Sequence, residues 1–205
     1  MKNILAIETA TNICSISLFL DGDFVETKDS AEPRSHAVKL PIFTDELLKK
    51  YNCKVSDLDG IAISSGPGSY TGLRIGMSLA KGLAFSSDLP LLPVKTLLAM
   101  DMNINENSPH WVCIHSHRDM VFAQKFHKHE SVSEPFCVSV NDLDASPIFG
   151  IELKNNNNDI DFTEILPSSK DIGIFALKNM TELMEKDLQK VSPFYLTEFN
   201  ISKLI

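Results

Sequence analysis

The residues that most plainly suggest chemistry lie in the segment ISSGPGSYTGLRIGMSLAKGLAF (63–85), which holds five of the nine glycines of the chain. A strand that runs through a glycine turn into a helix leaves free N–H groups at the helix start, and such groups bind phosphate. The lysine of a P-loop is missing, because the turn continues as Gly72-Leu73-Arg74, and Thr71 stands where GxGxxG needs its third glycine. The sequence therefore leaves only a vestigial phosphate site as an expectation, with Thr9, Thr11, Gly66, Gly68 and Ser69 as its contacts.

The helix expected after this turn carries small residues on one face. Gly72, Gly76 and Ala80 recur every four residues, and a glycine inside a helix costs about 1 kcal/mol relative to alanine. Two interpretations stay open: the face packs on the protein's own sheet, or a helix of another polypeptide covers it while Ile75 and Leu79 face the sheet. We predict the second, with the partner contacts at Gly72, Leu73, Gly76, Met77, Ala80, Leu40, Phe43 and Leu47.

Two histidine pairs and one serine invite other chemistry. His115/His117 and His127/His129 have the spacing of metal ligands, but a hairpin between them would hold the pairs about 20 Å apart at about 3.3 Å per residue. We therefore expect surface histidines rather than one metal site, with His110 beside His127 as the remaining alternative. Ser69 does not lie in a GxSxG motif and has no assignable histidine–acid pair, so no peptidase is expected.

The elements that must position these residues alternate along the first half of the chain. Strands are predicted at 4–7, 14–20, 24–25, 60–64 and 91–94, and helices at 34–51, 70–86 and 95–103. This order indicates a mixed sheet with helices packed on it. After a polar linker (103–109), we expect a hairpin (111–116 and 120–126), strands at 138–140 and 148–151, an asparagine loop (155–158), a helix at 172–188 and an extended end near residue 194.

Composition excludes several classes of protein. The 205 residues are 43% hydrophobic and 22% charged, as in ordinary globular proteins. No apolar run approaches the roughly 20 residues of a membrane span, and the N-terminus lacks the pattern of a secretory leader, so a cytoplasmic protein without a membrane is expected. The net charge is −8 and only three arginines occur, which predicts that any nucleic acid is held mainly by a partner.

Three segments carry a family resemblance. ILAIETAT (4–11), ISSGPGSYTGLRIGMSLAKGLA (63–84) and the stretch Pro90–Leu98 resemble the TsaB (YeaZ) family of bacterial tRNA threonylcarbamoyladenosine biosynthesis proteins, also called glycopeptidase-like. SPFYL around residue 194 is similar to the C-terminal signature of that family. The likeness is strong over residues 1–100 and thin between 105 and 190. It implies an α/β fold of the actin/Hsp70-like (ASKHA, ribonuclease H-like) type, with two subdomains of mixed sheets flanked by helices: 1–104 with the partner-binding helices, and a smaller, degenerate 105–205.

The resemblance also implies a function. Proteins of this kind pair with a catalytic TsaD paralogue and a TsaE ATPase, which together transfer threonylcarbamoyl to the adenosine beside the anticodon of tRNAs reading ANN codons. The TsaB-like member is the non-catalytic scaffold, contacts TsaD or a second copy of itself through its first two helices, and meets tRNA only indirectly. ATP and metal then belong to the partner subunits. The alternatives are an autonomous ATP-binding enzyme of the same superfold and a homodimeric structural protein without a link to tRNA.

Two features of the sequence bear on that implication. Catalytic relatives carry a pair of metal-binding histidines after the equivalent of Val94, whereas the present stretch 95–100 reads KTLLAM. This difference favours a subunit without a metal site of that kind. In the second half, His115-Ser116-His117 stands where relatives usually have Asp-Ala-Arg. The surface of the second half therefore differs from that of relatives.

Overall fold

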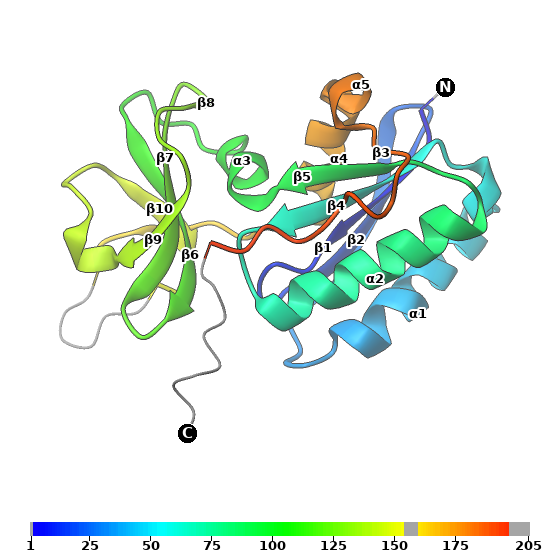
Figure 1. Cartoon of the computed structure of the whole chain (residues 1–205), viewed down its shortest axis with the longest axis horizontal. Helices are drawn as coiled ribbons and strands as arrows, with labels where there is room; N and C mark the ends of the chain where they lie inside the picture. The colour runs from blue at the N-terminus through cyan, green and yellow to red at the C-terminus, as the bar shows by residue number, and fades with distance from the viewer. Residues whose placement is uncertain (1, 154–159, 197–205) are drawn as a thin grey trace.

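The computed structural model describes residues 2–153 and 160–196, and within them the chain forms two β-sheets that lie side by side (Figure 1). The first sheet has the order β3-β2-β1-β4-β5. β1 pairs antiparallel with β2 and parallel with β4. Its strands are β1 (Ile4–Glu8), β2 (Cys14–Leu20), β3 (Asp23–Ser30), β4 (Gly60–Gly66) and β5 (Leu91–Lys95).

Helices cover both faces of this sheet (Figure 1), which explains why β1 is apolar on both sides. α1 (His36–Lys50) and α2 (Tyr70–Ser86) pack on one face, where Leu5 and Ile7 belong to their core. α4 (Ser169–Lys178) packs on the other face with Ile4 and Ala6, followed by the short α5 (Met180–Leu183). This arrangement confirms the predicted mixed sheet flanked by helices.

The second sheet is built around the predicted hairpin. Its order is β11-β10-β6-β7-β8, and β9 pairs with β7. The short α3 (Thr96–Asp101) joins the two sheets and adds Leu97 and Met100 to the core of the second. The strands are β6 (His110–His117), β7 (Met120–His127), β8 (Glu130–Ser131), β9 (Phe136–Ser139), β10 (Ile148–Ile151) and β11 (Thr163–Glu164), and 3-10 turns span Val55–Asp57 and Val140–Asp142.

The last part of the chain differs from the prediction. The single helix expected at 172–188 is wrong: α4 ends at Lys178, α5 ends at Leu183, and Glu185 pairs with Leu91 at the edge of the first sheet. The apolar face of α4, which carries Ile172 and Ala176, packs on the first sheet. The division into 1–104 and 105–205 therefore misassigns this segment, whose hydrophobic face is buried against residues far earlier in the chain. The predicted asparagine loop 155–158 lies outside the described residues.

Membrane insertion finds no support in the helices. Within residues 2–153 and 160–196, none of them combines the length and the apolar character that crossing a bilayer requires.

Candidate partner-binding face and glycine turn

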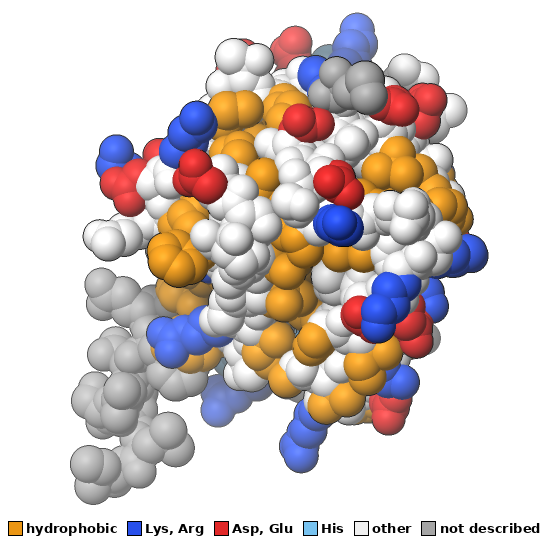
Figure 2. Space-filling view, turned by 90° about the vertical axis from the view of Figure 1, so that its right-hand side faces the viewer, with side chains coloured by type: hydrophobic (Ala, Val, Ile, Leu, Met, Phe, Trp, Pro, Cys, Tyr) orange, Lys and Arg blue, Asp and Glu red, His pale blue; other side chains and the backbone are white. Residues whose placement is uncertain are grey.

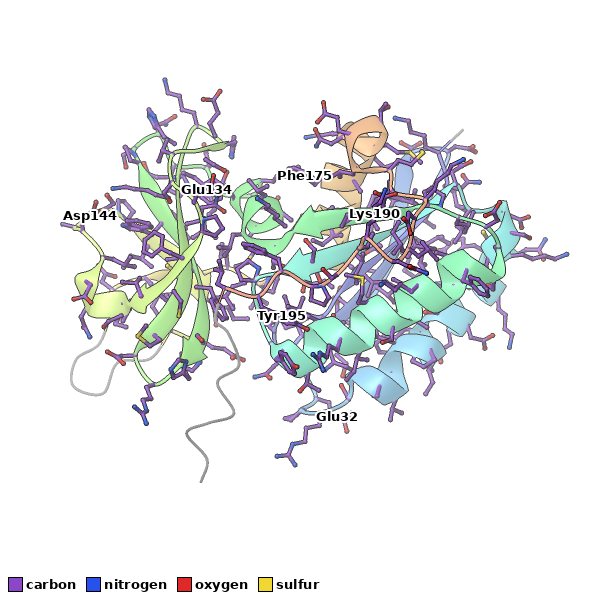
Figure 3. All side chains as sticks on the ribbon, viewed as in Figure 1. Glu32, Glu134, Asp144, Phe175, Lys190 and Tyr195 are labelled. Atoms are coloured by element: carbon purple, nitrogen blue, oxygen red, sulfur yellow. The ribbon has the colours of Figure 1, made fainter. Side chains whose placement is uncertain are left out.

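The glycine turn after β4 is covered by other parts of the chain. Gly66 has φ +105°, a conformation that favours glycine, and a Cβ there would lie 2.6 Å from the carbonyl oxygen of Phe194. The N–H of Phe194 donates to the carbonyl of Ser65 (2.7 Å), so the C-terminal segment is fixed across the turn. Figure 3 shows the neighbouring Tyr195 beside the N-terminal end of α2.

The residues expected to bind phosphate lie close together, and several of their polar groups form hydrogen bonds within the chain. The N–H of Ser69 donates to the carbonyl of Ala10 (2.6 Å), and a Cβ on Gly68 would overlap that same oxygen. The Ser69 hydroxyl accepts the N–H of Gly72 (3.2 Å) and so caps α2. Thr9 is fully buried, and the Thr11 hydroxyl accepts the N–H of Ile13. Ser69 and Thr11 thus use their polar groups within the chain, whereas the buried Thr9 hydroxyl has no hydrogen-bond partner among the described residues. The phosphate site stays a prediction.

The small-residue face of α2 packs inside the molecule. A Cβ on Gly72 would overlap the carbonyl oxygen of Thr9, and one on Gly76 would overlap the Thr9 hydroxyl oxygen, both well inside 3.0 Å. The interpretation of this face as an exposed partner surface is wrong, because the β1–β2 loop crosses the helix there. The other predicted contacts share this burial: Leu73, Ala80, Leu40 and Leu47 are 0% exposed, Met77 is 4% exposed, and Phe43 packs partly buried on the same core.

Replacing Gly72 with alanine is expected to lower the free energy of unfolding by about 1–3 kcal/mol, because the added methyl group meets a backbone oxygen that cannot rotate away. Gly82→Ala is the matched control in the same helix. A Cβ at Gly82 would have no heavy atom of the described residues within 4 Å, so this change should raise stability by about 1 kcal/mol. Urea unfolding of both variants measures the difference. Equal stabilities would contradict the close contact of α2 with Thr9.

The opposite side of the α1/α2 pair is open. Ile75 and Leu79, which we expected to face the sheet, line a groove of about 330 Å³ between the two helices. Large apolar side chains are exposed on these helices: Val38 is 61%, Ile42 46% and Phe85 83% exposed. We call this surface the α1/α2 groove; its lining residues are Ala37, Leu40, Pro41, Arg74, Ile75, Ser78 and Leu79.

The sequence does carry a signal for this groove, which the prediction missed. Ala37 and Pro41 on α1, and Arg74 and Ser78 on α2, each recur after four residues and so share one helix face. Gly82 continues the α2 row and has open space around it. Unlike Gly72, this glycine is not required by the packing of the chain itself.

Two of the histidines, the buried His110 and the exposed His129, share the carboxylate of Asp101. His110 is fully buried, and its Nε2 lies 2.8 Å from Oδ1 of Asp101, while Nδ1 of His129 lies 3.0 Å from Oδ2 of the same carboxylate. In the hairpin, His110 faces Phe126 and His117 faces Met120, so the two predicted pairs lie at opposite ends. Among residues 2–153 and 160–196, no three metal-binding side chains gather.

Glu8 is a fully buried carboxyl group at the end of β1. Burial raises its pKa to about 7, although the N–H of Ala10 and the Ser64 hydroxyl favour the charged form. Its Oε1 accepts the N–H of Ala10, whereas Oε2 has no hydrogen-bond partner in the described part of the chain. Asp171 on α4 also raises the pKa of Glu8 through its charge. A buried carboxyl group of this kind favours its neutral form.

Comparison with known proteins identifies relatives described as TsaD and as TsaB. A family model described as TsaD, tRNA N6-adenosine threonylcarbamoyltransferase, matches residues 30–143, more than half of the chain. A tRNA threonylcarbamoyladenosine biosynthesis protein TsaB of Haemophilus influenzae is 37% identical over 102 residues, which are 49% of this chain and 43% of that protein. The match thus spans less than half of that relative. A TsaB of Buchnera aphidicola from Baizongia pistaciae is 26% identical over 97% of this chain and 99% of its own.

Solved structures agree on the fold. YeaZ from Pseudomonas aeruginosa superposes with a TM-score of 0.75 at 22% sequence identity, covering 96% of this chain and 100% of that one. At this level of identity the likeness concerns the fold, and it extends over both sheets of the chain. It therefore agrees with the expected fold class.

Proposed function

The chain belongs to the family of TsaD and TsaB proteins, and from that membership we propose that it serves tRNA threonylcarbamoyladenosine biosynthesis as a non-catalytic scaffold subunit. Its partner is the catalytic TsaD-like paralogue, a tRNA N6-adenosine threonylcarbamoyltransferase. The contact is made by the α1/α2 groove and the apolar side chains beside it. A TsaE-like ATPase completes the machinery, so ATP and metal are held by the other subunits.

The observation that carries this proposal is the exposure of large apolar side chains on the two helices of the groove. Val38, Ile42 and Phe85 are each at least 46% exposed. Val38 and Ile42, four residues apart, share one face of α1, and a contiguous exposed apolar patch typically marks a surface that binds another protein. Gly82, in the same helix as Phe85, allows the close approach of a partner backbone. In the absence of the paralogue, the same face would join two copies of this chain.

A role without catalysis is supported by α3. The helix that carries the metal-binding histidines in catalytic relatives here reads TLLAMD, and its Leu97 and Met100 are buried in the core of the second sheet. These side chains fill space between the sheets and offer no imidazole ligand. The proposal therefore assigns the metal and ATP of the reaction to the other subunits.

Indirect contact with tRNA is supported by charge. The chain carries 19 basic and 27 acidic residues. On the face drawn in Figure 2, acidic and basic side chains are interspersed with hydrophobic ones, and the basic side chains of that face form no continuous surface. Grip on the phosphate backbone requires such a surface, so the partner supplies it.

Mixing the purified protein with the TsaD-like paralogue should give a stable complex, which size-exclusion chromatography with mass measurement detects. Gly82→Leu should weaken this complex by about ten-fold or more, because a large side chain then stands where the partner approaches. The fold should survive, since the position is open to solvent.

Lys178→Leu is the matched control, because Lys178 is an exposed helical residue on the opposite face of the first sheet. Its complex should equal that of the wild type. An intact complex of Gly82→Leu would refute the assignment of the groove. Unchanged levels of the modified nucleoside after depletion of this protein would refute the function as a whole.

A further inference from the structure

Among the residues that line the α1/α2 groove, Arg74 is the one with a cationic side chain. It projects from the second turn of α2, on the face that also carries Ser78. The remaining lining residues are apolar apart from Ser78. A partner that fills this groove therefore meets apolar walls and a single guanidinium.

The guanidinium is held in place by two aromatic side chains. Its carbon lies 4.0 Å from the ring centroid of Tyr70 and 6.0 Å from that of Tyr195. Its Nε donates to the Tyr195 hydroxyl (3.1 Å), and the two tyrosine rings lie 5.0 Å apart. Much of the rotamer freedom that a free arginine would lose on binding is thus already restricted.

The C-terminal segment supplies this support. Tyr195 follows Phe194, whose N–H donates to Ser65 and whose carbonyl lies against Gly66. The segment therefore connects the glycine turn to Arg74. This gives the SPFYL sequence a structural role next to the groove.

No carboxylate of the described residues forms an ion pair with Arg74, in contrast to the lysines of α1. Those three lysines all pair, as Lys39–Glu32 (3.4 Å), Lys49–Asp45 (2.7 Å) and Lys50–Glu26 (2.5 Å). Arg74 thus lines the groove with two tyrosines as its side-chain partners and without a carboxylate counter-charge from residues 2–153 or 160–196.

We propose that Arg74 is a specificity contact of the groove and binds a carboxylate that an otherwise apolar helix of the catalytic paralogue presents. The proposal rests on the proposed function and deepens it. The planar fork of a guanidinium matches a carboxylate with two parallel hydrogen bonds. The apolar lining favours a protein helix over a phosphate backbone, which would leave those walls without a suitable contact. Tyr195 acts as the positioning residue.

The test compares dissociation constants for the purified paralogue. Arg74→Gln is expected to weaken binding by about 30-fold. Arg74→Lys should also weaken binding, by about half as much on a logarithmic scale, because a lysine forms no forked pair with a carboxylate. Tyr195→Phe keeps the ring but removes the hydroxyl that accepts from Nε, and should weaken binding by about five-fold. Lys178→Gln, the same charge change on α4, should leave binding unchanged.

Charge reversal on both proteins identifies the acidic residue of the paralogue. Arg74→Glu should abolish the complex, and an Asp→Arg or Glu→Arg change on the paralogue's groove-facing helix should restore it. Because Arg74 is exposed, its variants should keep the fold. Circular dichroism and thermal unfolding of every variant verify this.

Four other outcomes would contradict the specificity contact, the proposed function or both. If the wild type forms a complex and Arg74→Gln binds as well as wild type, the specificity contact is refuted while the proposed function stands. If the wild type forms no complex, both fall. If Arg74→Gln abolishes only self-association, the groove belongs to a second copy. If it abolishes only binding of tRNA to the isolated protein, the groove takes RNA. Either of these two results overturns the proposal.

Discussion

Replacing Asp101 with alanine is expected to lower the free energy of unfolding by about 3 kcal/mol. The carboxylate is 2% exposed and lies 2.8 Å from His110 and 3.0 Å from His129. Without it, the fully buried Nε2 of His110 loses its partner and cannot reach water. Urea unfolding followed by tryptophan fluorescence measures the effect, since Trp111 directly follows His110.

The cluster matters because of where it stands. Asp101 ends α3, His110 begins β6 and His129 lies in the β7–β8 turn, so the contacts close the polar linker between the two sheets. The second ring nitrogen of His110 lies 3.0 Å from the carbonyl oxygen of Ser108, inside that linker. Loss of Asp101 should therefore also increase hydrogen exchange in residues 102–109.

Two further variants test whether stability is lost because His110 loses its hydrogen-bond partner. Asp101→Asn retains an acceptor oxygen for His110 and should lose less stability than Asp101→Ala. Asp161→Ala removes an exposed aspartate and should change stability by no more than about 0.5 kcal/mol. If Asp101→Ala proves as stable as Asp161→Ala, the cluster does not stabilise the junction.

Stability is expected to fall by about 3 kcal/mol between about pH 4.5 and 7 through Glu8 alone. Burial raises the pKa of Glu8 from 4.5 to about 7, so in this range the folded state holds a proton that the unfolded state releases. Raising the pH therefore favours unfolding across the range. Below pH 4.5 both states are protonated and above pH 7 both are ionised, so this contribution becomes constant.

The measurement is a series of urea unfolding experiments between pH 4.5 and 8 on wild type and Glu8→Gln. Glutamine has no proton to release, so the difference in stability between the two proteins should change with pH by about 3 kcal/mol. Glu164→Gln, at an exposed position on β11, should run parallel to wild type. A constant difference between wild type and Glu8→Gln would show that Glu8 does not titrate in this range.

Much of the fold follows from local patterns in the sequence. The strand at 14–20, the glycine turn that leads into the helix at 70–86 and the hairpin of 111–116 and 120–126 were predicted because turn residues and alternation act over a few positions. The helix over 172–188 was misjudged at its end. Its apolar pattern continues past Asn179, but Glu185 pairs with Leu91, and that contact is not encoded locally.

The candidate site was predicted only in part. The sequence singled out the two helices that line the proposed groove, but the face of α2 that it chose is buried, and it did not single out Arg74. Four-residue spacing indicates which side chains share a face, and says nothing about the neighbour that covers it. Tyr195 could not be connected to Arg74 either, since they are 121 positions apart.

The sequence by itself determined the order of strands and helices in the first half of the chain, the family resemblance and the small-residue row on α2, because each depends on neighbouring residues. Only the tertiary structure decided that this row lies against Thr9 and that the groove lies on the other side. The physical reason is that burial is a property of two surfaces in contact. One of those surfaces, the β1–β2 loop, is contributed by residues more than sixty positions earlier in the chain.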